Sequence, residues 1–398
     1  MARLKEYNGH YCESEYEYAF IGFLEAEGWK YSSGNNISRV TKRDVLIADD
    51  FKKFIADTNP DLTEDEVIQI YDNVRLVGAE SDFATLHKVY GWMVNGVQFT
   101  TQDGLPRMIP LIDFDNWDKN IFRVVNQFTV EYTNNGQKEN RRPDVLLFVN
   151  GMPLCVIELK NPADANATIY DAWEQINIRY WRDIPHLLHY CPLACISDGV
   201  KTRLGTVRTP YEHFYAWRRV NEGDAVSTLP FAETETMIKG VYAPERFMEI
   251  FRDYIYFQDS IYDSDEVEII CRYPQFFAAK LLKQSIVNSV VTRSGKGGTY
   301  FGATGCGKTY TMAFLARQLA LRCTDIPEIG SPTIILIVDR DELQKQGSKL
   351  FTKSKEFLNL GEVSVVKNRT QLRQELGARQ SGGFYICTIQ KFCDRKDD

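Results

Sequence analysis

The sequence predicts an α/β protein overall, with an α+β domain followed by a P-loop α/β domain. Between about residues 99 and 160, short β-rich runs alternate with Asn-Gly and Asp-Gly turns, which is typical of a largely antiparallel sheet. Beyond residue 260, helical patterns alternate with apolar strands of the kind that a parallel sheet buries on both faces. An acidic stretch at 259–268 separates the two patterns, so we expect domains at residues 1–260 and 261–398.

Length and composition agree with a folded protein of this size. The chain has 398 residues, of which 44% are hydrophobic and 25% charged, which argues against disorder and allows two or three domains. Its 47 basic and 54 acidic residues give a formal net charge of -7. A nucleic acid would therefore have to bind in a local basic groove, because the overall field is unfavourable.

Several sequence features indicate the compartment. No apolar run of about 18 residues is present, and the charged segment Met1–Tyr11 argues against a secretory signal, so we expect no membrane association. The nine cysteines include no Cys-x-x-Cys pair, which favours reduced thiols in the cytoplasm over a disulfide framework or a zinc ribbon. The pair His186 and His189 lacks nearby cysteine or carboxylate partners and is interpreted as structural.

The first domain is expected to begin with an amphipathic helix. Apolar residues recur at spacings of four, seven and eight from Tyr16, and the helix should end near Gly28. The apolar positions are Tyr16, Phe20, Phe23 and Leu24. Further along the chain we expect strands at 122–132, 145–149 and 154–159, a helix at 170–181 and a strand at 193–197.

The second domain is expected to alternate helices with strands. The expected elements are a helix at 274–290, a Gly-rich basic loop at 293–298, a short strand at 299–301, a helix at 310–321 and an apolar strand at 333–338.

The strongest motif is a phosphate-binding loop at 302–309, which fits G-x-x-x-x-G-K-[ST] between an expected strand and an expected helix. The glycines let backbone N–H groups surround a β-phosphate, and the N-terminus of the following helix favours the same oxygens. Lys308 would reach the β- and γ-phosphates, and the Thr309 hydroxyl would bind Mg²⁺. The alternative is a Gly-rich turn that matches by chance. The candidate ATP-binding residues here are Gly302, Thr304, Gly305, Cys306, Gly307, Lys308 and Thr309.

A second group of candidate ATP contacts lies upstream, at Arg272, Tyr273 and Gln275. A glutamine amide both donates and accepts hydrogen bonds, so Gln275 can pair with adenine and select ATP. Taken alone, a glutamine at the start of a helix is usually a solvated residue, and the phosphate loop downstream favours the nucleotide role.

Parts needed for ATP hydrolysis are missing from the sequence. A motor of this type needs an acidic pair at the end of another strand, and no apolar strand ending in Asp-Glu follows residue 309. A second lobe with its catalytic arginine is missing too. We expect the polypeptide as written to bind ATP but to hydrolyse it poorly or not at all.

A second constellation suggests metal-dependent cleavage of a phosphodiester. Asp144 follows a proline, and Glu158 and Lys160 follow an apolar run in the pattern E-x-K. Such cleavage needs carboxylates that hold Mg²⁺ and a group that positions water; Asp144 and Glu158 would be the ligands and Lys160 the third group. The alternative is an edge hairpin with a solvated Glu and Lys. Glu17 on the first helix would add a further carboxylate to this group. The alternative interpretation of Glu17 is a solvent-exposed acid.

The turn between these two strands decides whether the acids can meet. Glu158 and Lys160 share one face of a strand, and a two-residue turn would place Asp144 opposite Ile157, on the wrong face. We therefore expect a three-residue or bulged loop around Asn150–Met152, with Gly151 in the left-handed position.

In this order, and over nearly the full length, these motifs resemble the restriction (R) subunit of type I restriction-modification enzymes. The segments 142–144 and 158–160 are similar to the nuclease core of the PD-(D/E)xK class, together with Val124–Phe128, and Glu17 is similar to the acid on its first helix. The segment 272–275 and the phosphate loop look like motifs of a superfamily 2 translocase lobe.

The resemblance implies a PD-(D/E)xK endonuclease domain followed by an incomplete RecA-like lobe of a longer subunit. Such a subunit moves double-stranded DNA by using ATP and cuts it at distant, non-specific positions. A methyltransferase (M) subunit and a specificity (S) subunit, which reads the target sequence, would be its partners. The chain is then expected to be an N-terminal portion.

One element departs from the family pattern. The family's Q-x-x-x-Y would place Gln and Tyr four apart on one helix face, whereas Gln175 is followed by Arg179 at that spacing and by Tyr180 one residue later. Either Arg179 takes the place of the tyrosine, or the helix is locally overwound. Gln175 is expected near the phosphate or the Lys160 amine.

Two other functions remain open on the sequence alone. The chain could be a stand-alone ATP-gated nuclease or a helicase fragment of a defence or repair system. It could also be an assembly module with a vestigial nuclease site. Copurification with M and S subunits would distinguish an R subunit from a stand-alone nuclease or helicase fragment. Metal binding would distinguish an R subunit from an assembly module.

Overall fold

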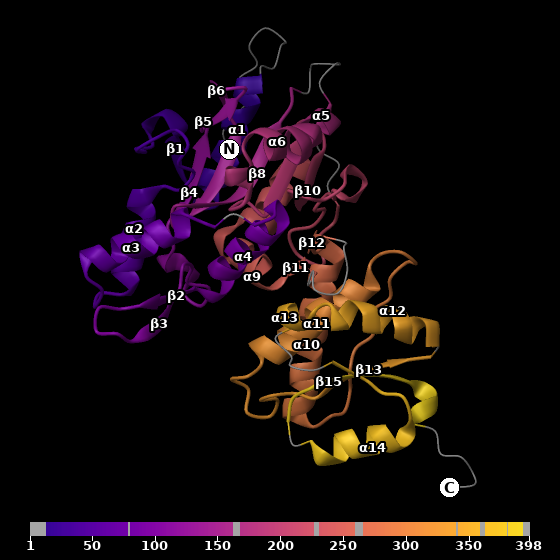
Figure 1. Ribbon diagram of the computed structural model, residues 1–398. Coiled ribbons are helices and arrows are strands. Elements are labelled where there is room, and N and C mark those ends of the chain that lie inside the picture. Colours follow the sequence, from indigo (N-terminus) through magenta and orange to yellow (C-terminus); the bar gives the residue numbers. More distant parts are fainter. Residues whose placement is uncertain are drawn as a thin grey trace, which may run out of the picture. The chain divides into compact units, whose positions relative to one another are not determined.

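The computed structural model describes residues 13–78, 80–161, 168–226, 231–258, 266–339, 341–358, 363–379 and 381–392. The chain divides into two compact units, residues 1–252 and 253–398 (Figure 1). The division falls a few residues before the expected boundary, and residue 260 itself lies outside the described residues.

The larger unit is built on a six-stranded mixed sheet of order β1-β4-β7-β8-β9-β10. Pairs β4–β7 and β7–β8 are antiparallel, as expected; β9–β10 is also antiparallel, whereas β1–β4 and β8–β9 are parallel. The central strands β7 and β8 are buried along their whole length, in agreement with their unbroken apolar runs. The strands are β1 (Lys30–Ser33), β4 (Phe122–Asn126), β7 (Val145–Val149), β8 (Met152–Leu159), β9 (Leu193–Ser197) and β10 (Thr202–Thr206).

Two further strand pairs belong to this unit, and one of them corrects an expectation. The strand expected at 122–132 is broken at Gln127, whose φ of 53° lies in the left-handed region. The chain leaves the main sheet there and forms an antiparallel hairpin of β5 (Val130–Asn134) and β6 (Gln137–Arg141). The other pair is β2 (Val97–Thr100) and β3 (Pro106–Ile109).

Helices pack on this sheet, and the first has the predicted apolar stripe. Phe20 and Leu24 of α1 are fully buried, and the Tyr16 hydroxyl lies 2.7 Å from Ser197 Oγ at the end of β9. Helix α1 packs on β1, β4 and β8, and α5 on β8 and β9. The helices of the unit are α1 (Glu13–Ala26), α2 (Ala48–Thr58), α3 (Glu64–Arg75), α4 (Asp82–Asn95), α5 (Ile169–Glu174), η3 (Gln175–Tyr180), α6 (Trp181–Asp183), α7 (Pro185–Leu188), α8 (Ala232–Met237), η5 (Ile238–Tyr242) and α9 (Pro244–Asp253), with short 3-10 turns η1 (Gly34–Asn36), η2 (Trp117–Lys119) and η4 (Tyr211–His213).

The smaller unit contains a three-stranded parallel sheet of order β13-β15-β14, as expected for its apolar strands. Its aromatic core includes Tyr254, whose ring centroid lies 4.9 Å from that of Phe276 and 5.4 Å from that of Phe314. The elements are β11 (Ile255–Phe257), β12 (Glu268–Ile270), α10 (Tyr273–Thr292), α11 (Lys308–Arg322), β13 (Ile334–Val338), α12 (Asp341–Thr352), α13 (Lys355–Leu358), β14 (Val363–Val365), α14 (Arg369–Ala378), β15 (Phe384–Thr388) and η7 (Ile389–Lys391).

The short strand expected at 299–301 is not formed. These residues pair with no strand among the described residues, and Phe301 is 94% exposed. Three residues cannot hold an extended conformation without a neighbouring ladder, because a strand is stabilised by hydrogen bonds to its partner. The predicted helix that follows is present as α11.

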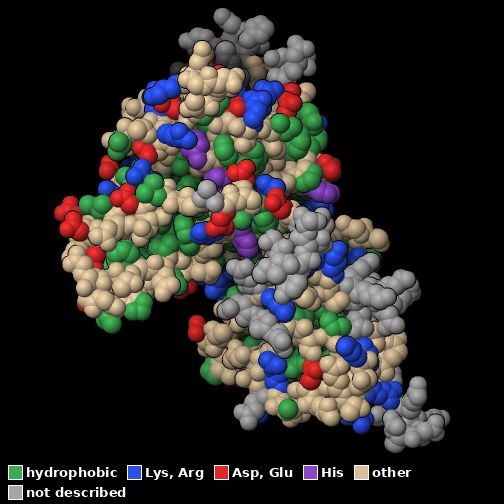
Figure 2. Space-filling model, viewed as in Figure 1, with side chains coloured by type: hydrophobic (Ala, Val, Ile, Leu, Met, Phe, Trp, Pro, Cys, Tyr) green, Lys and Arg blue, Asp and Glu red, His purple; other side chains and the backbone are tan. Residues whose placement is uncertain are grey.

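Residues of both charges, which the chain contains in similar numbers, lie on the surface (Figure 2). On the larger unit, basic and acidic side chains are interspersed over the face shown in Figure 2. None of the described helices combines the length and the apolar character needed to cross a bilayer.

We predict a loss of stability at mildly acidic pH that originates at His186. Its Nε2 is buried without a hydrogen-bond partner among the described residues, and burial, with the charges of Arg43 and His189, lowers its pKa to about 4. The unfolded chain, in which histidine titrates near pH ~6.5, binds the proton more tightly, so stability falls as the pH decreases from about 6.5 towards 4. The melting temperature of His186→Leu, measured across this range, should fall less than that of the wild type. The exposed His213→Leu serves as control, and equal slopes in the wild type and His186→Leu would contradict the prediction.

Candidate functional site

A tight turn and a bulge determine how β7 faces β8. Asn150 and Gly151 form a two-residue turn with φ of 50° and 77°, and Val149 pairs directly with Met152. The register then shifts, because Phe148 pairs with Pro153 but Leu147 pairs with Cys155. One residue of β8, Leu154, is therefore extra, and the shift brings Val145 opposite Ile157.

The expectation of a three-residue or bulged loop around Asn150–Met152 is thus wrong about where the extra residue lies. The expected consequence, that Asp144 and Glu158 share one face, is still met. The turn itself is tight because Asn150 is buried and donates to Leu111 O, and because a Cβ at Gly151 would collide with Ile47 O. The odd residue is instead placed in the strand. Asp144 therefore lies on the same face as Glu158, as the site requires.

The two carboxylates lie side by side in a buried setting. The Asp144 N–H lies 3.4 Å from Glu158 Oε1, and the Leu159 N–H donates to Asp144 Oδ2 at 2.8 Å. Glu158 is fully buried. Burial first, and then the charge of Asp144, raises the pKa of Glu158 well above its usual value, while Lys160 opposes the shift. Burial also raises the pKa of Asp144.

One glutamine connects the acids to the lysine. Gln175 Nε2 donates to Glu158 Oε2 at 2.6 Å, and Gln175 Oε1 accepts from Lys160 Nζ at 3.0 Å. The Tyr180 hydroxyl donates to Glu158 Oε1 at 2.6 Å and accepts from Gln175 Nε2 at 2.9 Å. The structure therefore brings together five of the six predicted catalytic residues.

The helix that carries Gln175 and Tyr180 is wound as a π-helix from Gln175 to Tyr180. In such a turn, residues five apart fall on one face, whereas an α-helix aligns residues four apart. Tyr180 therefore takes the position beside Gln175. Arg179 does not, since it forms an ion pair with Glu174 at 2.8 Å. The expectation of overwinding is wrong in sense, because a π turn holds more residues per turn than an α-helix.

Glu17 is buried close to this group but is bound differently from the expectation. Its Oε1 accepts from Asn126 Nδ2 at 2.6 Å, and its Oε2 accepts from Gln127 Nε2 at 2.8 Å. Gln127 also donates its backbone N–H to Asp144 O at 3.1 Å. Among the described residues, no three His, Cys, Asp or Glu side chains gather closely enough to hold a metal ion. The Glu17 carboxylate is thus hydrogen-bonded by two amide side chains at the C-terminal end of β4.

Asn126 and Gln127 were not identified as individual site residues from their own chemistry. The signal was present, since two amides lie at the end of a buried strand, one as its last residue and one directly after it, where side chains can reach a site. A partner 110 positions away, such as Glu17, is not visible in local sequence.

The chemistry of the acidic pair fits a hard divalent cation. Two adjacent carboxylates supply the oxygen ligands that Mg²⁺ prefers. Burial raises the pKa of both acids, and the charge of Asp144 adds to the shift at Glu158; a bound cation would offset this cost. Asp144 and Glu158 are the side chains that could hold it.

The phosphate loop has the backbone expected of its sequence. Gly305 and Gly307 have φ of 79° and 81°, and α11 begins at Lys308. Lys308 Nζ donates to Gly302 O and Ala303 O, both at 2.9 Å, so the loop curves around the ammonium group. Thr309 lies in the first helical turn. Thr304 and Cys306 complete the loop, the former exposed and the latter half-buried.

Gln275 lies against this loop from the N-terminal turn of α10, next to Arg272 and Tyr273. It is buried, its Nε2 donates to Gly307 O at 3.2 Å, and its Oε1 accepts from Arg272 N at 2.8 Å. Both ends of the Gln275 amide thus bind backbone atoms, one of them in the phosphate loop.

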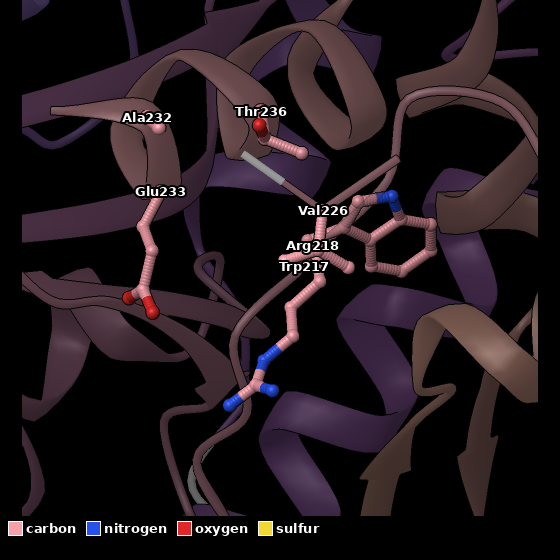
Figure 3. Close-up of a pocket in the computed structure, with 6 residues that line it drawn as sticks. All are labelled: Trp217, Arg218, Val226, Ala232, Glu233 and Thr236. Atoms are coloured by element: carbon pink, nitrogen blue, oxygen red, sulfur yellow. The ribbon is translucent and has the colours of Figure 1, made fainter. Parts of the chain in front are cut away.

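A separate cavity of about 230 Å³ lies elsewhere in the larger unit (Figure 3). None of the predicted site residues lines it. Its lining comprises Trp217, Arg218, Val226, Ala232, Glu233 and Thr236.

Comparisons with known proteins match both units. The family model described as type I restriction enzyme R protein N terminus matches residues 11–213, and the SWI2/SNF2 ATPase model matches residues 274–398. The chain is 29% identical to a putative type I restriction enzyme endonuclease subunit, MjaIXP, of Methanocaldococcus jannaschii, over 96% of this chain and 37% of that protein. It is also 29% identical to the type I restriction enzyme HindI endonuclease subunit of Haemophilus influenzae, over 97% of this chain and 37% of that protein. The chain thus spans little more than a third of the length of these relatives.

We predict that Tyr180 and Arg179, although adjacent, differ sharply in their contribution to stability. Tyr180→Phe leaves a buried acceptor of Glu158 without its O–H donor, which should lower the free energy of unfolding by roughly 1–3 kcal/mol. Arg179→Ala removes only a half-exposed ion pair and should change it by less than about 0.5 kcal/mol. Urea unfolding of both variants tests this, and equal effects would show that Tyr180 does not occupy the described position.

Proposed function

Because the chain belongs to the family of type I restriction enzyme R protein N termini, we propose that it is the endonuclease and ATP-binding portion of an R subunit. Within the longer protein it would cleave double-stranded DNA with Mg²⁺, coupled to ATP-driven DNA translocation. The partners would be the methyltransferase (M) and specificity (S) subunits, in the cytoplasm. The larger unit would have the PD-(D/E)xK nuclease fold, and the smaller one would be the first RecA-like lobe.

The observation that carries this proposal is the buried group around Glu158. Asp144 and Glu158 would hold Mg²⁺, and Lys160 would orient the attacking water or the scissile phosphate. Bound there, the ion would polarise the phosphate and lower the pKa of a water molecule. Gln175 keeps the Lys160 ammonium near the acids, and Tyr180 orients the Glu158 carboxylate. Glu17 would act through Asn126 and Gln127, as a buried anchor for the segment before Asp144.

The smaller unit would bind the nucleotide. We propose that the loop at 302–309 cradles the phosphates, that Thr309 contributes to a second Mg²⁺ site, and that Arg272, Tyr273 and Gln275 lie towards the base. None of the described strands β13, β14 and β15 ends in an adjacent Asp-Glu pair.

We predict that each acid of the pair is needed for metal binding. Asp144→Asn and Glu158→Gln keep the shape but remove a negative ligand, and each should weaken Mn²⁺ binding to the 398-residue chain by roughly tenfold or more, measured by calorimetry. Glu174→Gln, on the same helix as Gln175 but paired with Arg179, is the matched control and should bind normally. Unchanged affinity in the two variants would favour a non-catalytic assembly module.

Lys160→Ala extends this prediction to the assembled enzyme. DNA cutting should be lost while ATP turnover stays within about twofold of the wild type, because Lys160 belongs to the larger unit and the phosphate loop to the smaller one. A parallel fall in both activities would contradict the separation of roles.

We predict that Lys308→Ala abolishes ATP binding without unfolding the larger unit. The ammonium group would be the main positive charge for the phosphates, so titration with a fluorescent ATP analogue should show a loss of affinity of at least about tenfold. Mn²⁺ binding by the pair of Asp144 and Glu158 should remain. If that binding were also lost, the two units would not be independent.

A further inference from the structure

The π turn is held from the side opposite Glu158 by two backbone carbonyls. Trp173 Nε1 donates to Thr209 O at 2.9 Å, and Trp181 Nε1 donates to Val207 O at 2.8 Å. Between them, Asn177 Nδ2 donates to both, at 2.9 Å to Val207 O and 3.1 Å to Thr209 O. Three side chains spaced four apart thus bind the same short segment.

The segment that supplies these carbonyls is itself rigid. Thr206 and Thr209 are buried; the Thr206 N–H donates to Thr209 Oγ1 at 2.8 Å, and the Arg208 N–H donates to Thr206 Oγ1 at 3.2 Å. The Arg208 guanidinium lies 5.5 Å from the ring centroid of Trp181. The carbonyls therefore belong to a segment that is itself held by internal hydrogen bonds.

This support selects the π turn over an α-helix. In an α-helix, residues at i, i+4 and i+8 drift by about 40° at each step, so Trp173 and Trp181 would point about 80° apart. The π turn adds residues to one turn and reduces this drift, which lets Trp173, Asn177 and Trp181 reach neighbouring carbonyls. The same change of winding places Tyr180, five residues after Gln175, on the face that meets Glu158.

The far end of the helix is also fixed. Arg141, at the end of β6, binds Asp183 at 2.6 Å. This ion pair opposes sliding of the whole helix, so loss of the carbonyl contacts would favour a change in winding.

We propose that Trp173, Asn177 and Trp181 form a latch that keeps residues 175–180 in the π register, and that Asn177 is a positioning residue for the Tyr180–Glu158 contact. Without the latch, the segment would rewind as an α-helix and would turn Arg179, in place of Tyr180, towards Glu158. The consequence for metal binding rests on the function proposed above, whereas the positioning of Tyr180 does not.

The test uses the latch variant Asn177→Leu/Trp181→Phe in the full chain, which removes the donors to Val207 O but preserves apolar volume. Two quantities are measured: the ¹⁹F resonance of 3-fluorotyrosine placed at position 180, and the affinity for Mn²⁺. We expect the resonance to move towards the value of a solvent-exposed tyrosine, and the affinity to fall about 10- to 100-fold, as when an outer-shell partner of a metal ligand is lost.

A rescue separates positioning from general stabilisation. Arg179→Tyr added to the latch variant restores a Gln-x-x-x-Tyr spacing suited to an α-helix, so Mn²⁺ affinity should recover to within about threefold of the wild type. Arg179→Tyr in the wild-type background should change affinity by less than about twofold. Failure of the rescue in a latch variant that remains folded would overturn the proposal.

The ¹⁹F measurement keeps this inference distinct from the proposed function. If the wild-type chain bound no Mn²⁺ at Asp144 and Glu158, the nuclease proposal would fail, and a shifted resonance in the latch variant would still support the latch. An unchanged resonance would overturn the latch whatever the metal result.

Discussion

The burial of two carboxylates side by side, Asp144 and Glu158, is the constraint on which the surrounding structure depends. A buried carboxylate is costly unless its oxygens accept hydrogen bonds, and a second one beside it adds repulsion. The donors come from different elements: the Leu159 N–H from β8, and the Gln175 amide and the Tyr180 hydroxyl from the π turn. These donors offset part of the cost of burial, and the raised pKa values of Asp144 and Glu158 show that the compensation is incomplete.

Two one-residue offsets produce this arrangement, one in a strand and one in a helix. Without the extra residue Leu154, the tight Asn150–Gly151 turn would place Asp144 on the face opposite to Glu158. Without the π turn, the helix would carry Tyr180 away from Gln175. Each offset leaves its element hydrogen-bonded and buried on either side. Irregularities of this type are characteristic of functional sites, where a side chain must be aimed against the regular period of its element.

Local sequence predicted the elements whose residues interact with near neighbours. Spacing alone predicts the stripe of α1, the apolar strands β7 and β8 and the loop before α11. It also gives the requirement that Asp144 and Glu158 share a face. The location of the offsets could not be predicted, because it depends on distant partners: Ile47 O against Gly151, and the carbonyls of Val207 and Thr209 against the helix. The prediction of a strand at 299–301 was wrong for a related reason, because a short strand depends on a neighbouring strand that the described residues do not provide.

The two candidate sites share one electrostatic property: each holds a charged side chain by internal hydrogen bonds. The larger unit buries two acids side by side, with Lys160 held nearby by Gln175. The phosphate loop presents a positive group, and Lys308 is meanwhile bound to the carbonyls of Gly302 and Ala303. In each case a charged group is held by an internal contact. Binding would exchange these contacts for stronger ones to a cation or a phosphate, so ligands should stabilise each unit by an amount set by their own affinity.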